Sequence, residues 1–268
     1  MKTIVVPTDF SPNATKALRF AIQLANRFDA VVHLIHAYEL HSRAGMLMNI
    51  RDFIRKDSEK QLIQTMEQVK GDLLYTASLK SKTLQGDAID VITQYADSHE
   101  ADLIVMGTKG ASGLKEVFLG SNTEGLLKNT TKPVLAIPND FSEHSFDKIT
   151  LAVDAQVINN LEVLEPLRQI AQANKANVQV LHVEKENKTA VIDEGIDVFL
   201  SGVRHDFHII KHTSISAGIK AFNEETGANL LCMIRRKRNF LEKIFHTSIT
   251  EEKAFHANIP LLVIQDRS

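Results

Sequence analysis

The chain has 268 residues, a length that suits about two domains of roughly 100–150 residues each. Its composition is 44% hydrophobic and 24% charged, which excludes disordered, collagen-like and supercoiled classes of protein. Lysine plus arginine number 31 against 33 for aspartate plus glutamate. This balance argues against a protein that binds nucleic acid mainly through its net charge.

Three further observations concern the compartment. No apolar run approaches the roughly 20 residues that a membrane span needs. Residues 1–7 lead directly into a strand-like pattern, so we expect no signal peptide. Cys232 is the single cysteine, which excludes an internal disulfide and is typical of a reducing compartment. We therefore expect a soluble cytoplasmic protein with no membrane partner.

The first half of the chain alternates strands with helices. Short β-branched runs predict buried strands, and Ser11 and Asn13 are candidate caps of a helix with Pro12 in its first turn. The predicted strands are 3–6, 30–37, 79–84, 103–106 and 134–137, with helices ending at Phe28 and covering 46–70 and 88–99. This alternation predicts a parallel sheet covered by helices.

The second half repeats the first. Residues 228–264 align without a gap to residues 101–137 at an offset of 127, and 11 of 37 positions are identical. The first strands align at an offset of 145, so the second copy is about 18 residues shorter in its middle. Its predicted strands are 149–153, 178–183, 207–213, 230–234 and 261–264. We predict two tandem domains, 1–140 and 147–268.

Two segments of the first copy follow predicted strands at their carboxyl ends, where open parallel sheets bind ligands. Thr8 and Asp9 follow the first strand, and a glycine-containing segment with Gly107, Gly110 and Gly120 follows the fourth. Glycines allow backbone N–H groups to approach an anion closely. These two segments are therefore the candidate binding site.

The polar side chains of these segments suit different chemical groups of a ligand. A helix predicted to begin near Asn122 directs its positive end toward the site. Hydroxyls of Ser121 or Thr123 can donate to a phosphate oxygen, and Lys109 can add charge. The Asp9 carboxylate can accept hydrogen bonds from sugar hydroxyls or an exocyclic amine.

The spacing Gly107-x2-Gly110-x9-Gly120-Ser121 resembles the nucleotide-binding motif of the ATP-binding branch of the universal stress protein family. The segments IVVPTDFS, ADLIVMG and KPVLAIP also resemble that family, and the likeness covers the whole chain. It implies an α/β fold for each copy, an adenine nucleotide alpha hydrolase-like sandwich whose five parallel strands have the order 3-2-1-4-5. It also implies that the two copies pack as an internal pseudo-dimer.

The resemblance further implies roles for the matched residues. Thr8 and Asp9 would lie near the adenosine, and Ala37 would contact adenine through its backbone. The residues implied against the ribose are Met106 and Gly107, and those implied around the phosphates are Gly110, Gly120, Ser121 and Asn122, with Lys109 and Thr123 as additional candidates. A simpler interpretation stays open, in which the glycines only shape turns, Asp9 caps a helix and Lys109 is solvated.

The second copy lacks the glycine motif. At the offset of 127, the positions of Gly107, Gly110, Gly113 and Gly120 hold Ile234, Lys237, Phe240 and Thr247, and only the hydroxyl of Ser248 remains. Asp154 still matches Asp9. We expect that the second copy does not bind ATP in the manner of the family.

Two other clusters lie in the second copy. The run Arg235-Arg236-Lys237-Arg238 can attract an anion or nucleic acid, but a solvated basic loop is the favoured interpretation. His205, His208 and His212 suggest a metal site, yet only two of them share a face of a strand, so ordinary histidines are favoured.

Three buried-strand positions favour packing over chemistry. His36 and His182 occupy equivalent positions of the two copies, which indicates a packing role in the shared fold. Cys232 matches Val105 in a buried strand and is expected to be an inert core thiol.

We therefore predict a universal stress protein that binds ATP in its first domain, with Mg²⁺ as a candidate bridge between the phosphates. The second domain would serve for packing or regulation. No acid/base pair is evident, so hydrolysis is expected to be slow or absent. Two alternatives stay open: a stress-response scaffold without nucleotide and a slow ATPase. Homo-oligomers and protein partners are compatible with the sequence, and nucleic acid is not favoured.

Overall fold

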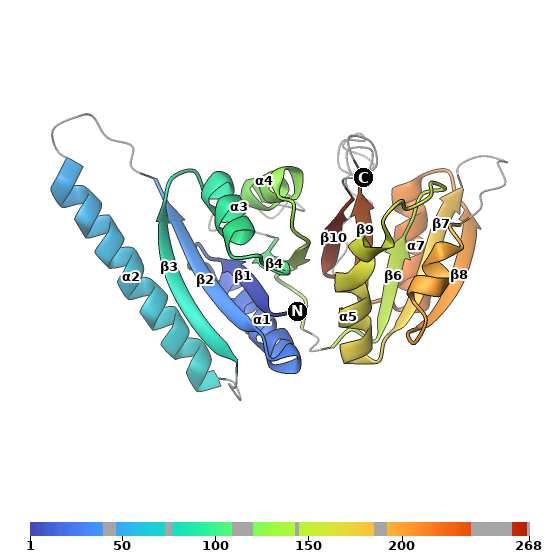
Figure 1. The fold of residues 1–268 in the computed structure, drawn as a ribbon, viewed down its shortest axis with the longest axis horizontal. Coiled ribbons are helices and arrows are strands. Elements are labelled where there is room, and N and C mark those ends of the chain that lie inside the picture. The colour runs from blue at the N-terminus through green and yellow to red at the C-terminus, as the bar shows by residue number, and fades with distance from the viewer. Residues whose placement is uncertain are drawn as a thin grey trace. The chain divides into compact units, whose positions relative to one another are not determined.

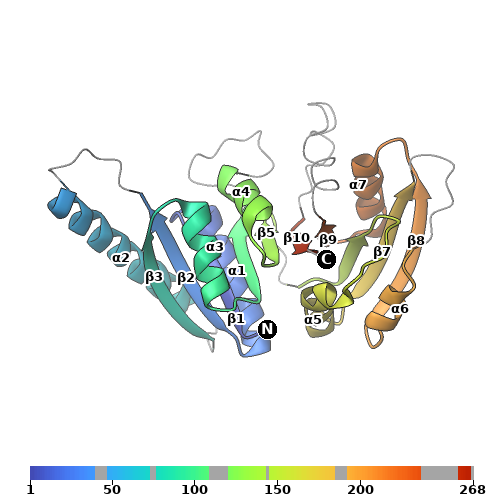
Figure 2. The same ribbon diagram turned by 45° about the horizontal axis from the view of Figure 1, so that its top comes forward.

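The computed structural model describes residues 1–39, 47–72, 77–108, 120–142, 145–184, 192–236 and 259–266. The chain divides into two compact units, Met1–Asn139 and Asp140–Ser268. Each unit consists of a twisted sheet with helices on both faces (Figures 1 and 2). Among the described residues, no helix is long and apolar enough to cross a membrane.

The first unit is a five-stranded parallel sheet with helices α1 and α2 on one face and α3 and α4 on the other (Figure 2). Its elements are β1 (Thr3–Pro7), α1 (Pro12–Phe28), β2 (Val31–Tyr38), α2 (Leu47–Asp72), β3 (Ser78–Gln85), α3 (Ala88–Ser98), β4 (Leu103–Gly107), α4 (Ser121–Asn129) and β5 (Val134–Ile137). The strand order β3-β2-β1-β4-β5 confirms the predicted order, with all four neighbouring pairs parallel.

The second unit repeats this topology. Its elements are β6 (Lys148–Ala152), the 3₁₀ helix η1 (Leu161–Leu164), α5 (Glu165–Asn174), β7 (Asn177–Glu184), α6 (Gly195–Phe199), β8 (Arg204–Lys211), α7 (Ile215–Thr226), β9 (Leu230–Arg235) and β10 (Leu261–Gln265). The order β8-β7-β6-β9-β10 is again 3-2-1-4-5, and the pairs are parallel. The packing of the two copies as a pseudo-dimer stays a prediction.

Helix α1 shows why the sequence folds as predicted here. The Ser11 side chain accepts a hydrogen bond from the Ala14 N–H (3.2 Å), and Pro12 occupies the first turn, where its missing N–H costs nothing. Asp29 ends the helix in a left-handed conformation, with φ of 52°. Asn13 is not a cap: it lies inside the helix and is buried.

The second unit is shorter than the first in its middle, as predicted, and one of its strands differs from its predicted bounds. The shortening of the second copy falls on the counterpart of α2, which has 26 residues, whereas α6 has five. Strand β8 begins three residues earlier than predicted, at Arg204, and ends before His212. Its register with β7 pairs Asn177 with Arg204 and Glu184 with Lys211, so edge pairing extends over polar residues that carry no apolar signal.

Candidate functional site

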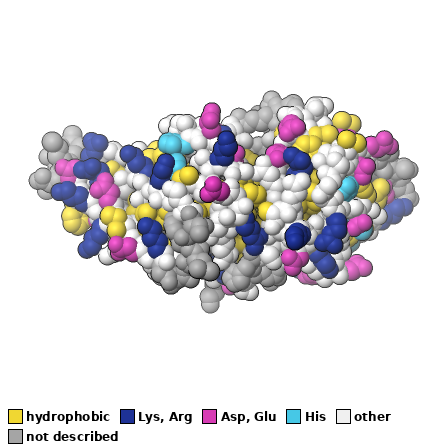
Figure 3. All heavy atoms as spheres, turned by 60° about the horizontal axis from the view of Figure 1, so that its bottom comes forward, with side chains coloured by type: hydrophobic (Ala, Val, Ile, Leu, Met, Phe, Trp, Pro, Cys, Tyr) yellow, Lys and Arg dark blue, Asp and Glu magenta, His cyan; other side chains and the backbone are white. Residues whose placement is uncertain are grey.

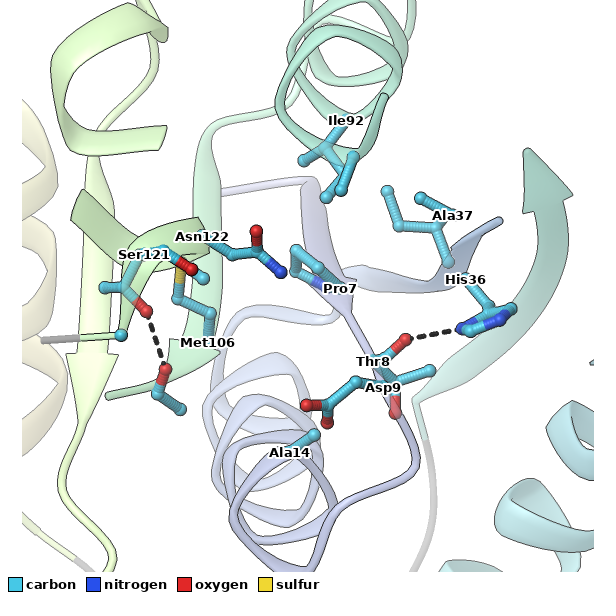
Figure 4. A pocket seen from close by; sticks show the side chains of 15 residues that line it. Pro7, Thr8, Asp9, Ala14, His36, Ala37, Ile92, Met106, Ser121 and Asn122 are labelled. Carbon is cyan, nitrogen blue, oxygen red and sulfur yellow. Dashed lines mark hydrogen bonds between the residues drawn. The ribbon is translucent and has the colours of Figure 1, made fainter. Parts of the chain in front are cut away.

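A cavity of about 350 Å³ opens at the carboxyl ends of the first unit's strands β1, β2 and β4 (Figure 4). Nine of the eleven predicted site residues line it: Thr8, Asp9, Ala37, Met106, Gly107, Gly120, Ser121, Asn122 and Thr123. The other two, Lys109 and Gly110, lie outside the described residues. Six further residues line the cavity: Pro7, Ala14, Ile35, His36, Ala88 and Ile92.

The turn after β1 is held by its own polar side chains. The Thr8 N–H donates to the Ile35 carbonyl oxygen (2.8 Å), and Thr8 Oγ1 accepts from the N–H of Phe10 (3.0 Å). Asp9 Oδ1 accepts from the N–H of Ser11 (3.0 Å). Phe10 has a φ of 63°, in the left-handed region that residues other than glycine rarely adopt. These bonds fix the turn, so Asp9 shapes the start of α1 as well as lining the cavity.

His36, at the end of β2, holds the same turn from the side. Its Nδ1 lies 2.8 Å from the Thr8 carbonyl oxygen, so this nitrogen carries a proton and donates (Figure 4). The imidazole also packs against the Phe10 ring, with centroids 4.4 Å apart. The sequence predicts a packing role for His36 and does not indicate it as a site residue. Its place beside Ala37, at a strand's carboxyl end, was the available signal.

The N-terminus of α4 forms the wall opposite that turn. Gly120 is the N-cap residue, and no side chain caps the helix there. Gly120 N–H donates to the Thr108 carbonyl oxygen (2.6 Å), which brings the start of α4 against the end of β4. Thr123 Oγ1 donates to the Gly107 carbonyl oxygen (3.0 Å). A first turn without a side-chain cap favours an anion through its N–H groups and the helix dipole.

The two described glycines of the motif have different physical roles. A Cβ atom on Gly107 would lie 2.3 Å from Nδ2 of Asn13, so this glycine allows α1 to pack against β4. Gly120 has φ of −63° and ψ of 157°, a conformation open to any residue. The simpler interpretation, a structural glycine, is therefore sufficient for Gly107. At Gly120 the backbone conformation gives no reason for glycine.

The remaining cavity wall combines apolar and polar groups. Ala37, Ala88, Ile92 and Met106 contribute apolar side chains, and Asp9 contributes a carboxylate. Such a mixture suits a ligand with a flat apolar part and a charged part. Among the described residues, no group of three or more His, Cys, Asp or Glu side chains could hold a metal ion.

The candidate metal-site histidines of the second unit, His205, His208 and His212, have separate partners. His205 Nε2 lies 2.9 Å from Asp197 Oδ1, and His208 packs on the Phe222 ring with centroids 5.0 Å apart. His212 Nδ1 accepts from the N–H of Ser214 (3.2 Å). They do not form one site.

The pKa of His205 is raised. Burial opposes protonation, but the carbonyl of Val203 accepts a hydrogen bond from the ring, and the hydrogen bond and charge of Asp197, together with the charge of Asp206, favour the imidazolium.

The structure describes Cys232 and the first two residues of the basic run, Arg235 and Arg236. Cys232 is fully buried in β9, and desolvation raises the pKa of its thiol, which fits an inert core residue. Arg236 corrects the expectation of a solvated loop: its side chain is 17% exposed and ion-paired with Asp154 and Asp266. Lys237 and Arg238 lie outside the described residues. On the face that Figure 3 shows, basic and acidic side chains are interspersed.

Comparisons with known proteins agree on one family. The model of the universal stress protein family matches residues 1–138 and 198–265. The universal stress protein MJ0531 of Methanocaldococcus jannaschii is 32% identical over 143 residues, covering 51% of this chain and 81% of that protein.

Two solved structures are also similar. A universal stress protein of Archaeoglobus fulgidus has a TM-score of 0.74 at 21% identity, covering 98% of this chain and 96% of its own. A universal stress protein solved in complex with cAMP has a TM-score of 0.41 at 23% identity, covering 51% of this chain and 96% of its own.

Proposed function

Because this chain belongs to the universal stress protein family, we propose that its first unit binds ATP in the cavity beside α4, whereas its second unit binds none. One observation carries the proposal: the turn after β1 and the uncapped start of α4 line the same cavity. The turn after β1 and the start of α4 would recognise different parts of a nucleotide. A ligand that carries both a polar base or sugar and an anion satisfies both walls at once.

In this proposal, each wall has a separate task. The base packs against the apolar side chains of Ala37, Ala88 and Ile92, and the Asp9 carboxylate accepts hydrogen bonds from the sugar or an exocyclic amine. The phosphates lie at Gly120 and the first turn of α4, where N–H groups and the helix dipole favour negative charge. The second unit then serves as a packing or regulatory partner.

A divalent cation fits this site only as a companion of the phosphates. Asp9 supplies a single carboxylate to the cavity wall. Mg²⁺ takes six oxygen ligands, and phosphates and waters commonly supply most of them. When bound, Mg²⁺ would neutralise phosphate charge. Of the residues that line the cavity, Asp9, Ser121 and Thr123 offer side-chain oxygens to it or to its waters.

Isothermal titration calorimetry with ATP tests the proposal. We expect one ATP per chain, bound more tightly with Mg²⁺ than with a chelator present. Asp9→Asn should weaken binding, whereas the matched variant Asp154→Asn in the second unit should leave the affinity for ATP unchanged. A failure of the unmodified chain to bind adenine nucleotides would contradict the proposal and favour a scaffold role. Two ATP molecules per chain would contradict the division of roles between the units.

A further inference from the structure

Arg236, directly after β9, contacts three residues of the second unit through its guanidinium group. Its NH1 lies 3.1 Å from Asp154 Oδ1 and donates to Gln156 Oε1 (3.0 Å). Its NH2 donates to the carbonyl oxygen of Gln156 (3.1 Å), and its Nε lies 3.3 Å from Asp266 Oδ2. All three guanidinium nitrogens therefore have acidic or carbonyl partners in a planar fork, an arrangement that lysine cannot reproduce.

The partners of Arg236 come from two strand ends other than its own. Asp154 and Gln156 lie in the turn after β6, and Asp266 directly follows β10. The Asp266 N–H donates to the carbonyl oxygen of Arg235 (2.9 Å), so the end of β10 is also joined to β9 through a backbone hydrogen bond. Arg236 thus joins the ends of three neighbouring strands, β6, β9 and β10.

The turn that Arg236 contacts is built like the turn that lines the cavity of the first unit. Asp154 Oδ1 accepts from the N–H of Gln156 (3.3 Å), as Asp9 Oδ1 accepts from the N–H of Ser11. In the first unit this turn lines the cavity. In the second unit the carboxylate of the same turn is paired with a guanidinium of the chain itself.

Because these ion pairs are largely buried, they matter for the stability of the second unit. The Asp266 side chain is 4% exposed and that of Arg236 is 17% exposed, so water screens their attraction weakly. Removing one partner of a buried ion pair leaves the other charge desolvated and unpaired, which is strongly destabilising. Arg236 is the cation that these two carboxylates share.

We propose that Asp154, Gln156 and Asp266 form a guanidinium-binding site that the chain fills with its own Arg236. This internal ligand holds the ends of β6, β9 and β10 together, at the edge where the first unit has its cavity. The pairing with Arg236 gives Asp154 a role that needs no nucleotide. It also keeps the ends of these three strands together without any external ligand. The proposal does not depend on whether the first unit binds ATP.

Cys232 supplies a reporter that is specific to the second unit. It is the single cysteine of the chain and is fully buried in β9. Its strand neighbours are Leu151 of β6 and Leu262 of β10, the same two strands that Arg236 joins to β9. A thiol reagent reaches it only when these strands open, so the rate of labelling reports the population of the open form.

The experiment measures the labelling rate of Cys232 in the full-length chain with a thiol reagent. Arg236→Ala should raise this rate at least roughly tenfold, because it removes the guanidinium that joins the two carboxylates. Millimolar ethylguanidinium, which replaces the atoms that the substitution removes, should return the rate most of the way to that of the unmodified chain. Propylammonium, with the same charge but no fork, should not.

Arg204→Ala is the matched control, since the exposed Arg204 makes one hydrogen bond to the Lys175 carbonyl oxygen (2.8 Å). It should leave the labelling rate within about twofold, as expected for an exposed site. Equal rates for Arg236→Ala and the unmodified chain would overturn the proposal, as would equal rescue by propylammonium.

A second variant covers the case in which Arg236→Ala does not accumulate as folded protein. Arg236→Lys keeps the positive charge but cannot reach both carboxylates and Gln156 together. Labelling of Cys232 should be faster in this variant than in the unmodified chain. An unchanged rate would show that charge alone suffices and would overturn the guanidinium site.

Discussion

The turn after the first strand is held in the same way in the two units, by a histidine near the end of the second strand. His36 Nδ1 lies 2.8 Å from the Thr8 carbonyl oxygen, and His182 Nδ1 lies 3.0 Å from the Val153 carbonyl oxygen. What differs is the use of the carboxylate that follows. Asp9 lines a cavity, whereas Asp154 is paired with Arg236.

This difference shows that a strand-end turn, however well preserved between copies, does not by itself indicate a ligand site. The turn serves the fold in both units, because a buried carbonyl needs a donor wherever it occurs. The glycine motif of Gly107, Gly110 and Gly120 is what sets the sequence of the first unit apart. Three predictions test this comparison.

The largest effect is expected where the units differ most in sequence. Gly120→Val adds a side chain to a residue that lines the cavity, without backbone strain because φ is −63°. We expect the affinity for ATP to fall by about 100-fold or more, near 3 kcal/mol, from lost space and lost approach to backbone N–H groups. Calorimetry measures the affinity.

Thr247→Val, at the matching sequence position of the second copy, is the control for that substitution. It should leave the affinity for ATP unchanged. If Gly120→Val bound ATP like the unmodified chain, the cavity beside α4 would not be the site.

A smaller effect is expected where the units agree. His36→Phe keeps a ring beside Phe10 but leaves the Thr8 carbonyl oxygen without the imidazole donor. The affinity for ATP should fall by roughly tenfold, since an unsatisfied buried carbonyl costs about 1–3 kcal/mol. His182→Phe should destabilise the second unit similarly and leave the affinity unchanged. Equal losses of affinity in both variants would show that the histidines act only through global stability.

The smallest expected effect is on the pH dependence of stability, whose slope should have opposite signs in the two units. Burial, together with the nearby His99 and Lys80, lowers the pKa of His33 in the first unit, whereas the pKa of His205 is raised. The unfolded value is about 6.5 for both. The contribution of His33 to stability is therefore present above that pH and lost as pH falls through its folded pKa. The contribution of His205 is present below it and lost as pH rises through its folded pKa.

Hydrogen exchange of peptides from β2 and β8, corrected for intrinsic rates between pH 5 and 8, measures these slopes. His33→Gln should remove the slope in β2 and leave that in β8, and His205→Gln should do the reverse. Slopes of one sign in both units would contradict the assignment.

The sequence predicted most strands to within one or two residues, because buried parallel strands such as β1 and β4 are short apolar runs between polar turns. The edge strand β8 was placed three residues late, since Arg204–Asp206 pair with β7 yet carry no apolar pattern. The family motif also predicted nine residues that line one cavity. His36 also lines the cavity, but the sequence did not predict this. The pattern of a strand does not distinguish a histidine that only packs from one that lines a cavity.

The sequence by itself determined the duplication, the alternation of strands and helices in each copy and the loss of the glycine motif in the second, whereas the strand order was implied by the family resemblance. These properties are local or repeat along the chain, so residue patterns carry them. Only the tertiary structure decided what Asp154 and Arg236 do. Asp154 and Arg236 are 82 residues apart in the chain, and an ion pair between separate strand ends depends on the folded arrangement of those ends and on their burial.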